Sequence, residues 1–397
     1  MINVRSIGTK RLMTIENSHH IIITHGYHPP WIHGETITTR NIITMLKEIS
    51  KHRPIIYSSI DADRFEGVML RDVFYIKLNN IRDYVVLAHI LSQHFTEVRN
   101  EPVFLHLSGV KEHLIYLLGK LCSVYPKDFS ILVYDFGEIP GYRRIPRILK
   151  LVFDNYLDLI LTTSLHTYMQ YGRYFKIYYM PPPIVPPDKL YATSLDDKCD
   201  SKLINNSLYH IIYIGHLYEF RFPYKIVLKT IYKIIKSGFR DLKLLIIAPK
   251  TRYNVEMSKI IEKYSDGLGI QRNVLVLSEN LTEKCKYELL NKTNIFLFIP
   301  TRQPVTMDPP ISVIEAMFSG NVVIATRYMS LEYIIKDYVN GIIINNISID
   351  VLYEKLKNVL NNDNLREHIS QNAKRYAFKN YYYINLMERL KDIVIME

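Results

Sequence analysis

One short stretch of the chain carries residues that can bind phosphate. The stretch YIGHLYEFRF places Gly215, His216 and Arg221 directly after a β-branched run that is typical of a strand. A guanidinium can make bidentate contacts to phosphate oxygens, and a glycine lets the backbone approach them closely. A basic loop residue is more often only solvated, so this stretch alone leaves both interpretations open.

A second stretch, TMDPPISVIEAMFSGNVVIAT at 306–326, is typical of a Pro-rich loop, a short helix and a strand. If Ile311, Ser312 and Val313 form the first helical turn, their N–H groups and the helix dipole can receive a diphosphate. Glu315 would then accept hydrogen bonds from ribose hydroxyls. An isolated Glu there more often interacts only with the dipole, but two anion-binding loops in one domain together predict a nucleotide diphosphate site.

Both loops need a scaffold that gathers strand ends at one edge. Apolar runs such as HHIIITHG, VFLHLSG, YHIIYIGHL and LKLLIIAP alternate with helical patterns, which is typical of parallel α/β sheets. The segment KIYYMPPPIVPPDKLY interrupts this alternation, because prolines fit neither helices nor central strands. We therefore predict two Rossmann-like domains facing each other across a cleft, residues 1–186 and 187–375, followed by an amphipathic helix at 376–397. Ligands should bind at the carboxyl ends of the strands.

Composition narrows the class of protein. A chain of 397 residues with 48% hydrophobic residues can bury two cores. A formal charge of +11 favours an anionic partner such as a nucleotide, a nucleic acid or an acidic membrane surface. The N-terminus lacks the apolar stretch of a signal peptide and no run is long enough to cross a bilayer, which predicts a cytoplasmic protein. The three cysteines match no metal-ligand spacing, and we predict no metal site.

The second stretch, together with residues 332–346, resembles the signature of a known family. PPISVIEAMFSGNVVIAT and the later EYIIKDYVNGIIINN resemble the E-x7-E, A-M-x-x-G-x-P-V-V-A-T and D-G-x-x-G pattern of retaining GT-B glycosyltransferases of family 4, or group 1. YIGHLYEFR resembles that family's G-R-L-x-x-x-K, and PPWIHGE its P-P-x-x-G-G loop. The resemblance extends over nearly the whole chain in order, although only 308–342 is individually specific.

The resemblance implies a metal-independent, hexosyltransferase-like enzyme of GT-B fold. It would move a sugar with retention from a nucleotide diphosphate, UDP- or GDP-linked, to a hydroxyl acceptor, without a separate cofactor. Arg221, with His216 beside it, would neutralise the diphosphate, and Glu315 would hold the ribose. Gly34 would let the N-terminal loop approach the donor, and the helix at 376–397 would cross back to the N-terminal domain.

Three catalytic candidates come from comparison with the family pattern. The first Glu of the pair falls on Met307, so the neighbouring Asp308 is the candidate to face the transferred sugar. The family often places a His after an N-domain strand, where His106 and Asp135 stand at predicted strand ends. A strand-end His is more often structural, and the missing Glu puts activity in question.

Several partners and functions stay open on the sequence alone. The segment 141–153 is basic and amphipathic, which suits either an acidic membrane with a lipid-linked acceptor or a solvated helix face. The acceptor is a glycan, a lipid-linked molecule or a protein, with nucleic acid less favoured. A DNA-modifying sugar transferase and a catalytically weak nucleotide-sugar binder are the alternatives. An oxidoreductase is disfavoured, because no G-x-G-x-x-G comes after the strand predicted at 21–25.

Overall fold

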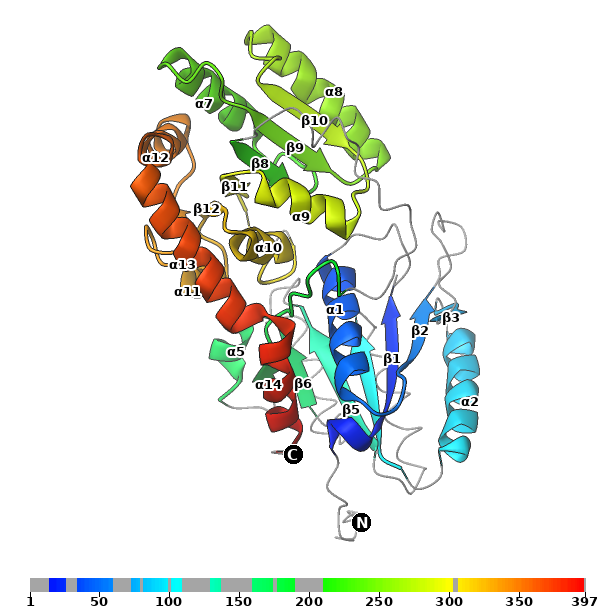
Figure 1. The fold of residues 1–397 in the computed structure, drawn as a ribbon. Helices are drawn as coiled ribbons and strands as arrows, with labels where there is room; N and C mark the ends of the chain where they lie inside the picture. The colour runs from blue at the N-terminus through cyan, green and yellow to red at the C-terminus, as the bar shows by residue number, and fades with distance from the viewer. Residues whose placement is uncertain are drawn as a thin grey trace. The chain divides into compact units, whose positions relative to one another are not determined.

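The chain forms two compact units in a computed structural model, each built around one parallel sheet (Figure 1). Unit 1 combines Met1–Pro183 with Tyr383–Glu397, and unit 2 comprises Ile184–Tyr382, where the sequence predicts boundaries at 187 and 376. The structure describes residues 14–25, 34–59, 73–78, 81–98, 101–108, 129–136, 159–173, 177–189, 210–302 and 306–395.

Unit 1 contains a seven-stranded sheet in the order β3-β2-β1-β4-β5-β6-β7, and every neighbouring pair is parallel. Its strands are β1 (His19–His25), β2 (Ile55–Ser59), β3 (Val73–Ile76), β4 (Val103–Ser108), β5 (Phe129–Asp135), β6 (Leu159–Thr162) and β7 (Ile177–Tyr179). The strand order reverses between β1 and β4, which is the switch point of a Rossmann-like sheet.

Helices cover the unit 1 sheet through apolar stripes. The described helices of unit 1 are η1 (Ile15–Asn17), α1 (Gly34–Ile49), α2 (Ile81–Glu97), α5 (Leu165–Tyr171) and α14 (Tyr383–Ile395). Leu87, Leu91 and Phe95 recur every four residues along α2 and pack in one cluster with Ile21 and Ile23 of β1. The C-terminal helix α14 belongs to unit 1 and packs against α1.

Unit 2 repeats the same strand order with six parallel strands, β10-β9-β8-β11-β12-β13. These strands are β8 (Ile211–Ile214), β9 (Leu244–Ala248), β10 (Val274–Ser278), β11 (Ile295–Phe298), β12 (Val322–Thr326) and β13 (Ile342–Ile344). Their nearly continuous Ile, Leu and Val runs fit strands that are buried on both faces. The order reverses between β8 and β11, so the two units confirm the predicted α/β class with Rossmann-like sheets.

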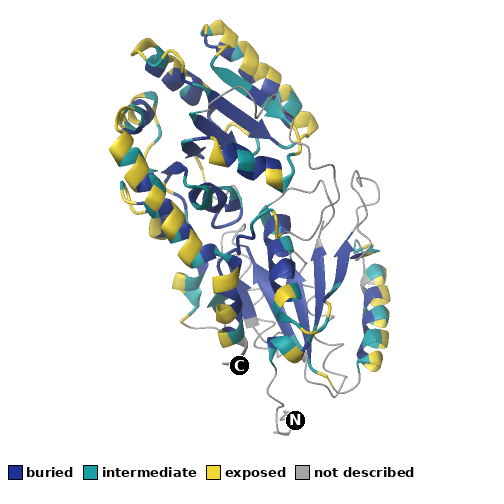
Figure 2. Cartoon of the chain, in the orientation of Figure 1, coloured by how far each residue is buried: buried dark blue, intermediate teal, exposed yellow. Residues whose placement is uncertain are grey.

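The helices of unit 2 form layers outside the buried sheet (Figure 2). They are α7 (Tyr224–Lys236), α8 (Arg252–Gly267), α9 (Glu283–Asn291), α10 (Ile311–Ser319), α11 (Leu331–Ile334), α12 (Ile349–Asn361) and α13 (Asp363–Tyr381). Helix α7 packs against α8 and α12, whereas α10 packs against α9 and α13. Thr251, Thr282 and Ser348 start α8, α9 and α12 by accepting a hydrogen bond from the first-turn backbone.

The short helix of the 306–326 stretch ends where its sequence predicts. Gly320 comes after Ser319 with φ 86°, a left-handed conformation that favours glycine, and its N–H bonds to the carbonyls of Ala316 and Met317. Strand β12 begins two residues later, at Val322. The 306–326 stretch therefore forms the predicted helix and strand, which places the first turn of α10 at the carboxyl side of β11.

Two sequence predictions fall outside the described residues. These are the basic segment 141–153 and residues 29–33, the part of the loop PPWIHGE that precedes Gly34. In the part of the chain that the structure describes, no helix combines the length and apolarity needed to cross a bilayer. The predicted membrane contact through 141–153 therefore stays a prediction.

Candidate functional site

Two loops meet at the switch point of unit 2. Strands β8 and β11 are parallel neighbours, so the segments that come after them leave the sheet side by side. The N–H of Thr301 after β11 donates to the carbonyl of Phe220 after β8 at 2.8 Å. The guanidinium carbon of Arg302 lies 3.7 Å from the centre of the Phe220 ring. The crevice at such a switch point is where open α/β sheets bind their ligands.

Arg221 brings an unsatisfied donor to this edge. Its backbone N–H bonds to the carbonyl of Tyr218 at 2.7 Å, which fixes the turn after β8. Its Nε is buried and has no hydrogen-bond partner among the described residues. A buried donor without an acceptor is unfavourable, and a guanidinium pairs best with phosphate or carboxylate oxygens. Arg221 is therefore positioned to receive an anion.

The buried Asn254 of α8 holds the loop that precedes Arg221. Its Oδ1 accepts from the N–H of Leu217 at 3.0 Å, and its Nδ2 donates to the carbonyl of Pro249 at 2.7 Å. The same Nδ2 lies 3.2 Å from Nδ1 of His216. An accepting Nδ1 places the ring proton of His216 on Nε2. Asn254 fixes the loop from a distant helix, and its position in the sequence alone gives no indication of this role.

A close side chain leaves little room for a Cβ at Gly215. A Cβ added there would lie 2.8 Å from the hydroxyl oxygen of Tyr213, which itself donates to the carbonyl of His216 at 2.7 Å. We expect Gly215→Ala to lower the free energy of unfolding by roughly 1–3 kcal/mol through overpacking. Urea unfolding measures this change. Gly267→Ala is the matched control, since a Cβ there meets nothing within 4 Å; equal losses in both variants would contradict the predicted clash.

The first turn of α10 offers two backbone donors. In the part of the chain that the structure describes, the N–H groups of Ile311 and Ser312 have no acceptor. The N–H of Val313 bonds to the carbonyl of Pro310 at 3.0 Å. Val313 is thus already paired, so two of the three predicted amides, together with the positive end of the helix dipole, can face an anion.

Glu315 lies in a buried network of charges that the sequence analysis missed. It is 2% exposed, and its Oε1 accepts from Lys286 Nζ at 2.6 Å, while the same Nζ lies 2.6 Å from Oε2 of Glu283. Burial raises the pKa of Glu315 to about 7, although Lys286 opposes this shift. Burial alone would lower the pKa of Lys286, but the two carboxylates hold it above its usual value. Lys286, on α9, thus orients Glu315, the residue that we predict to bind the ribose.

Asp308 is fully buried and fastens the loop before α10. Its Oδ1 accepts from the N–H of Ser330 at 3.0 Å, and its Oδ2 accepts from the hydroxyl of Ser330 at 2.5 Å. Met307, where the family pattern has its first Glu, is also fully buried. These contacts connect the loop to the start of α11, and a direct role of Asp308 toward a sugar stays a prediction.

Comparisons with known proteins show which proteins this chain is similar to. Residues 199–376 match the family described as Glycosyl transferases group 1. Over these residues the chain is therefore similar to group 1 glycosyl transferases, and we call residues 199–376 the group 1 domain. All six strands of unit 2 lie within the group 1 domain. The whole chain is 25% identical over 368 residues to an uncharacterized glycosyltransferase of Methanocaldococcus jannaschii, which covers 88% of this chain and 91% of the relative.

Solved structures share the fold over both units. A glycosyltransferase from Rickettsia africae aligns with a TM-score of 0.67 and 16% identity, over 96% of this chain and 99% of that one. HepE of Anabaena in complex with UDP aligns with a TM-score of 0.69 and 11% identity, over 96% of this chain and 100% of that one. The group 1 domain is thus the second half of a GT-B fold.

His106 lies outside the group 1 domain, in the interior of β4. Strand β4 pairs with β1 and β5 as far as Ser108, two residues beyond His106. The expected strand-end position is therefore wrong. Its Nδ1 lies 2.8 Å from the Tyr134 hydroxyl and its Nε2 2.9 Å from Nδ1 of His20, whose Nε2 is 2.8 Å from the Ile15 carbonyl. A carbonyl only accepts, so His20 carries its proton on Nε2, His106 donates to His20, and Tyr134 donates to His106. Burial lowers the pKa of His106, which keeps it neutral.

The other two predicted residues of unit 1 lie at the carboxyl side of its sheet. Asp135 is the last residue of β5, is buried, and accepts from the Thr162 hydroxyl at 2.9 Å. Gly34 is the first residue of α1, which comes after β1 along the chain. Asp135 and Gly34 thus belong to unit 1, whereas Arg221, Glu315 and the α10 amides belong to the group 1 domain.

Proposed function

We propose that the chain transfers a sugar from a nucleotide diphosphate, UDP- or GDP-linked, to a hydroxyl acceptor, with retention and without a metal ion. One observation carries this proposal: the unpaired Nε of Arg221 and the open amides of Ile311 and Ser312 belong to loops that leave adjacent parallel strands. The group 1 match supports sugar transfer. The structures of Anabaena HepE with UDP and with UDP-glucose support a uridine nucleotide.

The proposed chemistry depends on the charge that develops on the leaving group. Breaking the sugar–phosphate bond builds negative charge on the diphosphate, and fixed cations and N–H dipoles stabilise it without reorganising. Arg221 and the first turn of α10 fill this role in the proposal, and Glu315 holds the ribose through its second oxygen. Asp308 positions the loop before α10, and His106 stabilises the sheet of unit 1. Asp135 is the acceptor-side candidate for proton transfer.

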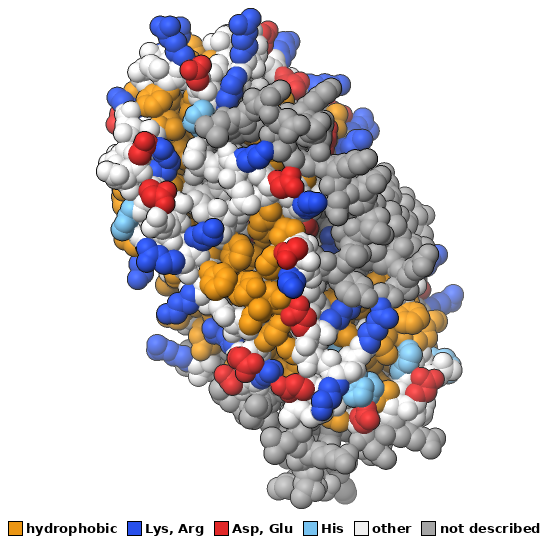
Figure 3. All heavy atoms as spheres, viewed as in Figure 1, with side chains coloured by type: hydrophobic (Ala, Val, Ile, Leu, Met, Phe, Trp, Pro, Cys, Tyr) orange, Lys and Arg blue, Asp and Glu red, His pale blue; other side chains and the backbone are white. Residues whose placement is uncertain are grey.

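A nucleotide-sugar binder with weak or no transfer is the second candidate. The buried Met307 favours it, because the family pattern has a carboxylate at that position. A DNA-modifying transferase has less support. Figure 3 shows Asp and Glu side chains interspersed among the Lys and Arg side chains of the described residues on this face, so the charge there is mixed.

Binding of nucleotides to wild-type protein and to Glu315→Gln tests the proposal. In calorimetry with a chelator present, we expect wild type to bind UDP or GDP, and the variant to bind roughly 10–100-fold more weakly after losing a hydrogen bond to a charged group. Glu332→Gln on α11 is the control, because that side chain is partly exposed and pairs only with Arg327 among the described residues.

The outcomes separate the candidates. No binding of any nucleotide to folded wild type would overturn the proposal as a whole. Equal affinity in Glu315→Gln would remove Glu315 from the ribose site. Binding without release of sugar from the cognate nucleotide sugar, in the presence of glycan, lipid-linked and protein acceptors, would favour the binder over the transferase.

A further inference from the structure

Three potential metal ligands gather at the amino-terminal edge of the unit 1 sheet. His19 is the first residue of β1, His52 precedes β2, and Glu101 precedes β4. Strand β1 lies between β2 and β4, with Ile21 opposite Ile55 and His19 opposite Val103. The parallel topology therefore brings together three segments that lie far apart in the sequence, at the edge opposite the carboxyl ends of the strands.

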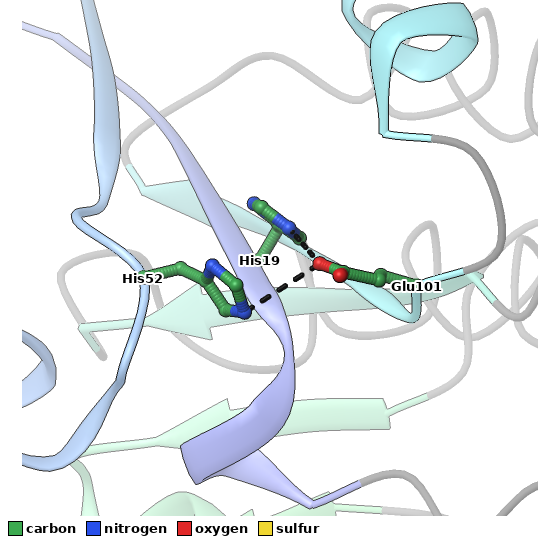
Figure 4. A group of neighbouring side chains, drawn as sticks. All are labelled: His19, His52 and Glu101. Carbon is green, nitrogen blue, oxygen red and sulfur yellow. Dashed lines mark hydrogen bonds and ion pairs between the residues drawn. The ribbon is translucent and has the colours of Figure 1, made fainter.

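The side chains converge on one point (Figure 4). Nε2 of His19 contacts Oε2 of Glu101, and Nε2 of His52 lies 3.5 Å from the same oxygen. The two imidazole rings are stacked, with centroids 3.9 Å apart. One ligand atom from each of the three residues lies within 4.8 Å of the others.

A hydrogen-bonded pair of one histidine and one carboxylate does not explain this arrangement. Such a pair occurs on α2, where Nδ1 of His94 lies 3.4 Å from Oε2 of Glu97. At the sheet edge a second imidazole turns its Nε2 toward the same carboxylate oxygen. Two imidazole nitrogens and one carboxylate oxygen form a ligand set that zinc uses in proteins, with open positions for water.

We propose that His19, His52 and Glu101 bind one divalent transition-metal ion of the zinc class. Imidazole ligands favour zinc and its neighbours over magnesium and calcium, which prefer oxygen ligands. The side chains are 22%, 33% and 49% exposed, so an ion reaches them from solvent and Glu101 can swing aside to admit it. The ion would connect β1, the α1–β2 connection and the segment before β4.

A metal at this position acts on stability and not on sugar transfer. An ion that binds only the folded state raises the melting temperature in proportion to the logarithm of its concentration above its dissociation constant. The site belongs to unit 1, outside the group 1 domain, so it is independent of the proposed nucleotide site.

Zinc titration of the full chain after removal of metals with a chelator tests this proposal. We expect one zinc ion per chain, a higher melting temperature with ZnCl2, and no comparable rise with MgCl2. His52→Ala and Glu101→Gln should each lose more affinity than the roughly 10–100-fold that accompanies loss of an outer-shell partner. His94→Ala, which removes a histidine from an ordinary His–carboxylate pair, should bind zinc like wild type.

Two results would overturn the site. One is zinc affinity in His52→Ala and Glu101→Gln that equals that of wild type, and the other is a melting temperature that zinc leaves unchanged. Cobalt(II) absorption in wild type and its loss in both variants give a second readout, which does not depend on stability. UDP binding should be the same with and without zinc, so failure of this site and failure of the nucleotide site are distinguishable.

Discussion

Arg221→Ala should lower the rate of sugar release from the nucleotide sugar roughly 100- to 1000-fold, the effect of removing a fixed donor from a developing anion. The same change should leave the free energy of unfolding unchanged or higher, because it removes a buried Nε that has no partner among the described residues. Donor hydrolysis measures the first effect, and urea unfolding measures the second. A loss of activity without a loss of stability is typical of a group that serves a ligand.

Two further substitutions show how much of the effect on activity is specific to the guanidinium of Arg221. Arg221→Lys keeps the positive charge but loses the planar guanidinium, so its activity should lie between those of wild type and Arg221→Ala. Arg302→Ala removes an exposed cation that stacks on Phe220 in the adjacent loop, and its effect should be much smaller. The guanidinium carbon of Arg221 also lies 6.0 Å from the centre of the Tyr218 ring. Wild-type affinity for UDP in Arg221→Ala would show that Arg221 serves only this packing contact.

The sequence predicts much of the fold because the strands are buried on both faces. Burial on two sides selects continuous apolar runs, and such runs stand out between amphipathic helices. The match between the stretch at 306–326 and α10 with β12 has a local cause, since Gly320 ends the helix through its own backbone conformation. Features set by a few consecutive residues are therefore predictable from the sequence.

The partners of the site residues are not predictable in this way. Glu283 and Lys286 stand three residues apart on α9, a spacing that is typical of an exposed surface pair. The structure instead buries Lys286 against Glu315 of another helix. The ligands His19 and His52 meet only because β1 and β2 are neighbours in the sheet. Strand order decides these contacts, and strand order is a property of the whole unit.

Lys286→Met should be the most destabilising of the substitutions considered, at roughly 3–5 kcal/mol, because it leaves a buried carboxylate without its partner. Lys286 Nζ lies 2.6 Å from oxygens of both Glu283 and Glu315, and the Glu315 side chain is 2% exposed. Urea unfolding at pH 8 measures the loss. Lys233→Met is the control, since Lys233 Nζ pairs with Asp350 at 2.7 Å on the surface, where solvent screens the interaction.

The same network predicts how this loss depends on pH. Burial raises the pKa of Glu315 from 4.5 to about 7. Between these two pH values the folded state therefore holds a proton that the unfolded state has released. The stabilisation from Glu315 is complete below pH 4.5 and disappears as the pH rises through 7. Without Lys286 the folded pKa rises further, so Lys286→Met should lose far less stability at about pH 5 than at about pH 8. The double variant Lys286→Met/Glu315→Gln should recover much of the lost stability at the higher pH. If the loss in Lys286→Met does not depend on pH, Glu315 is not the buried group that this substitution leaves uncompensated.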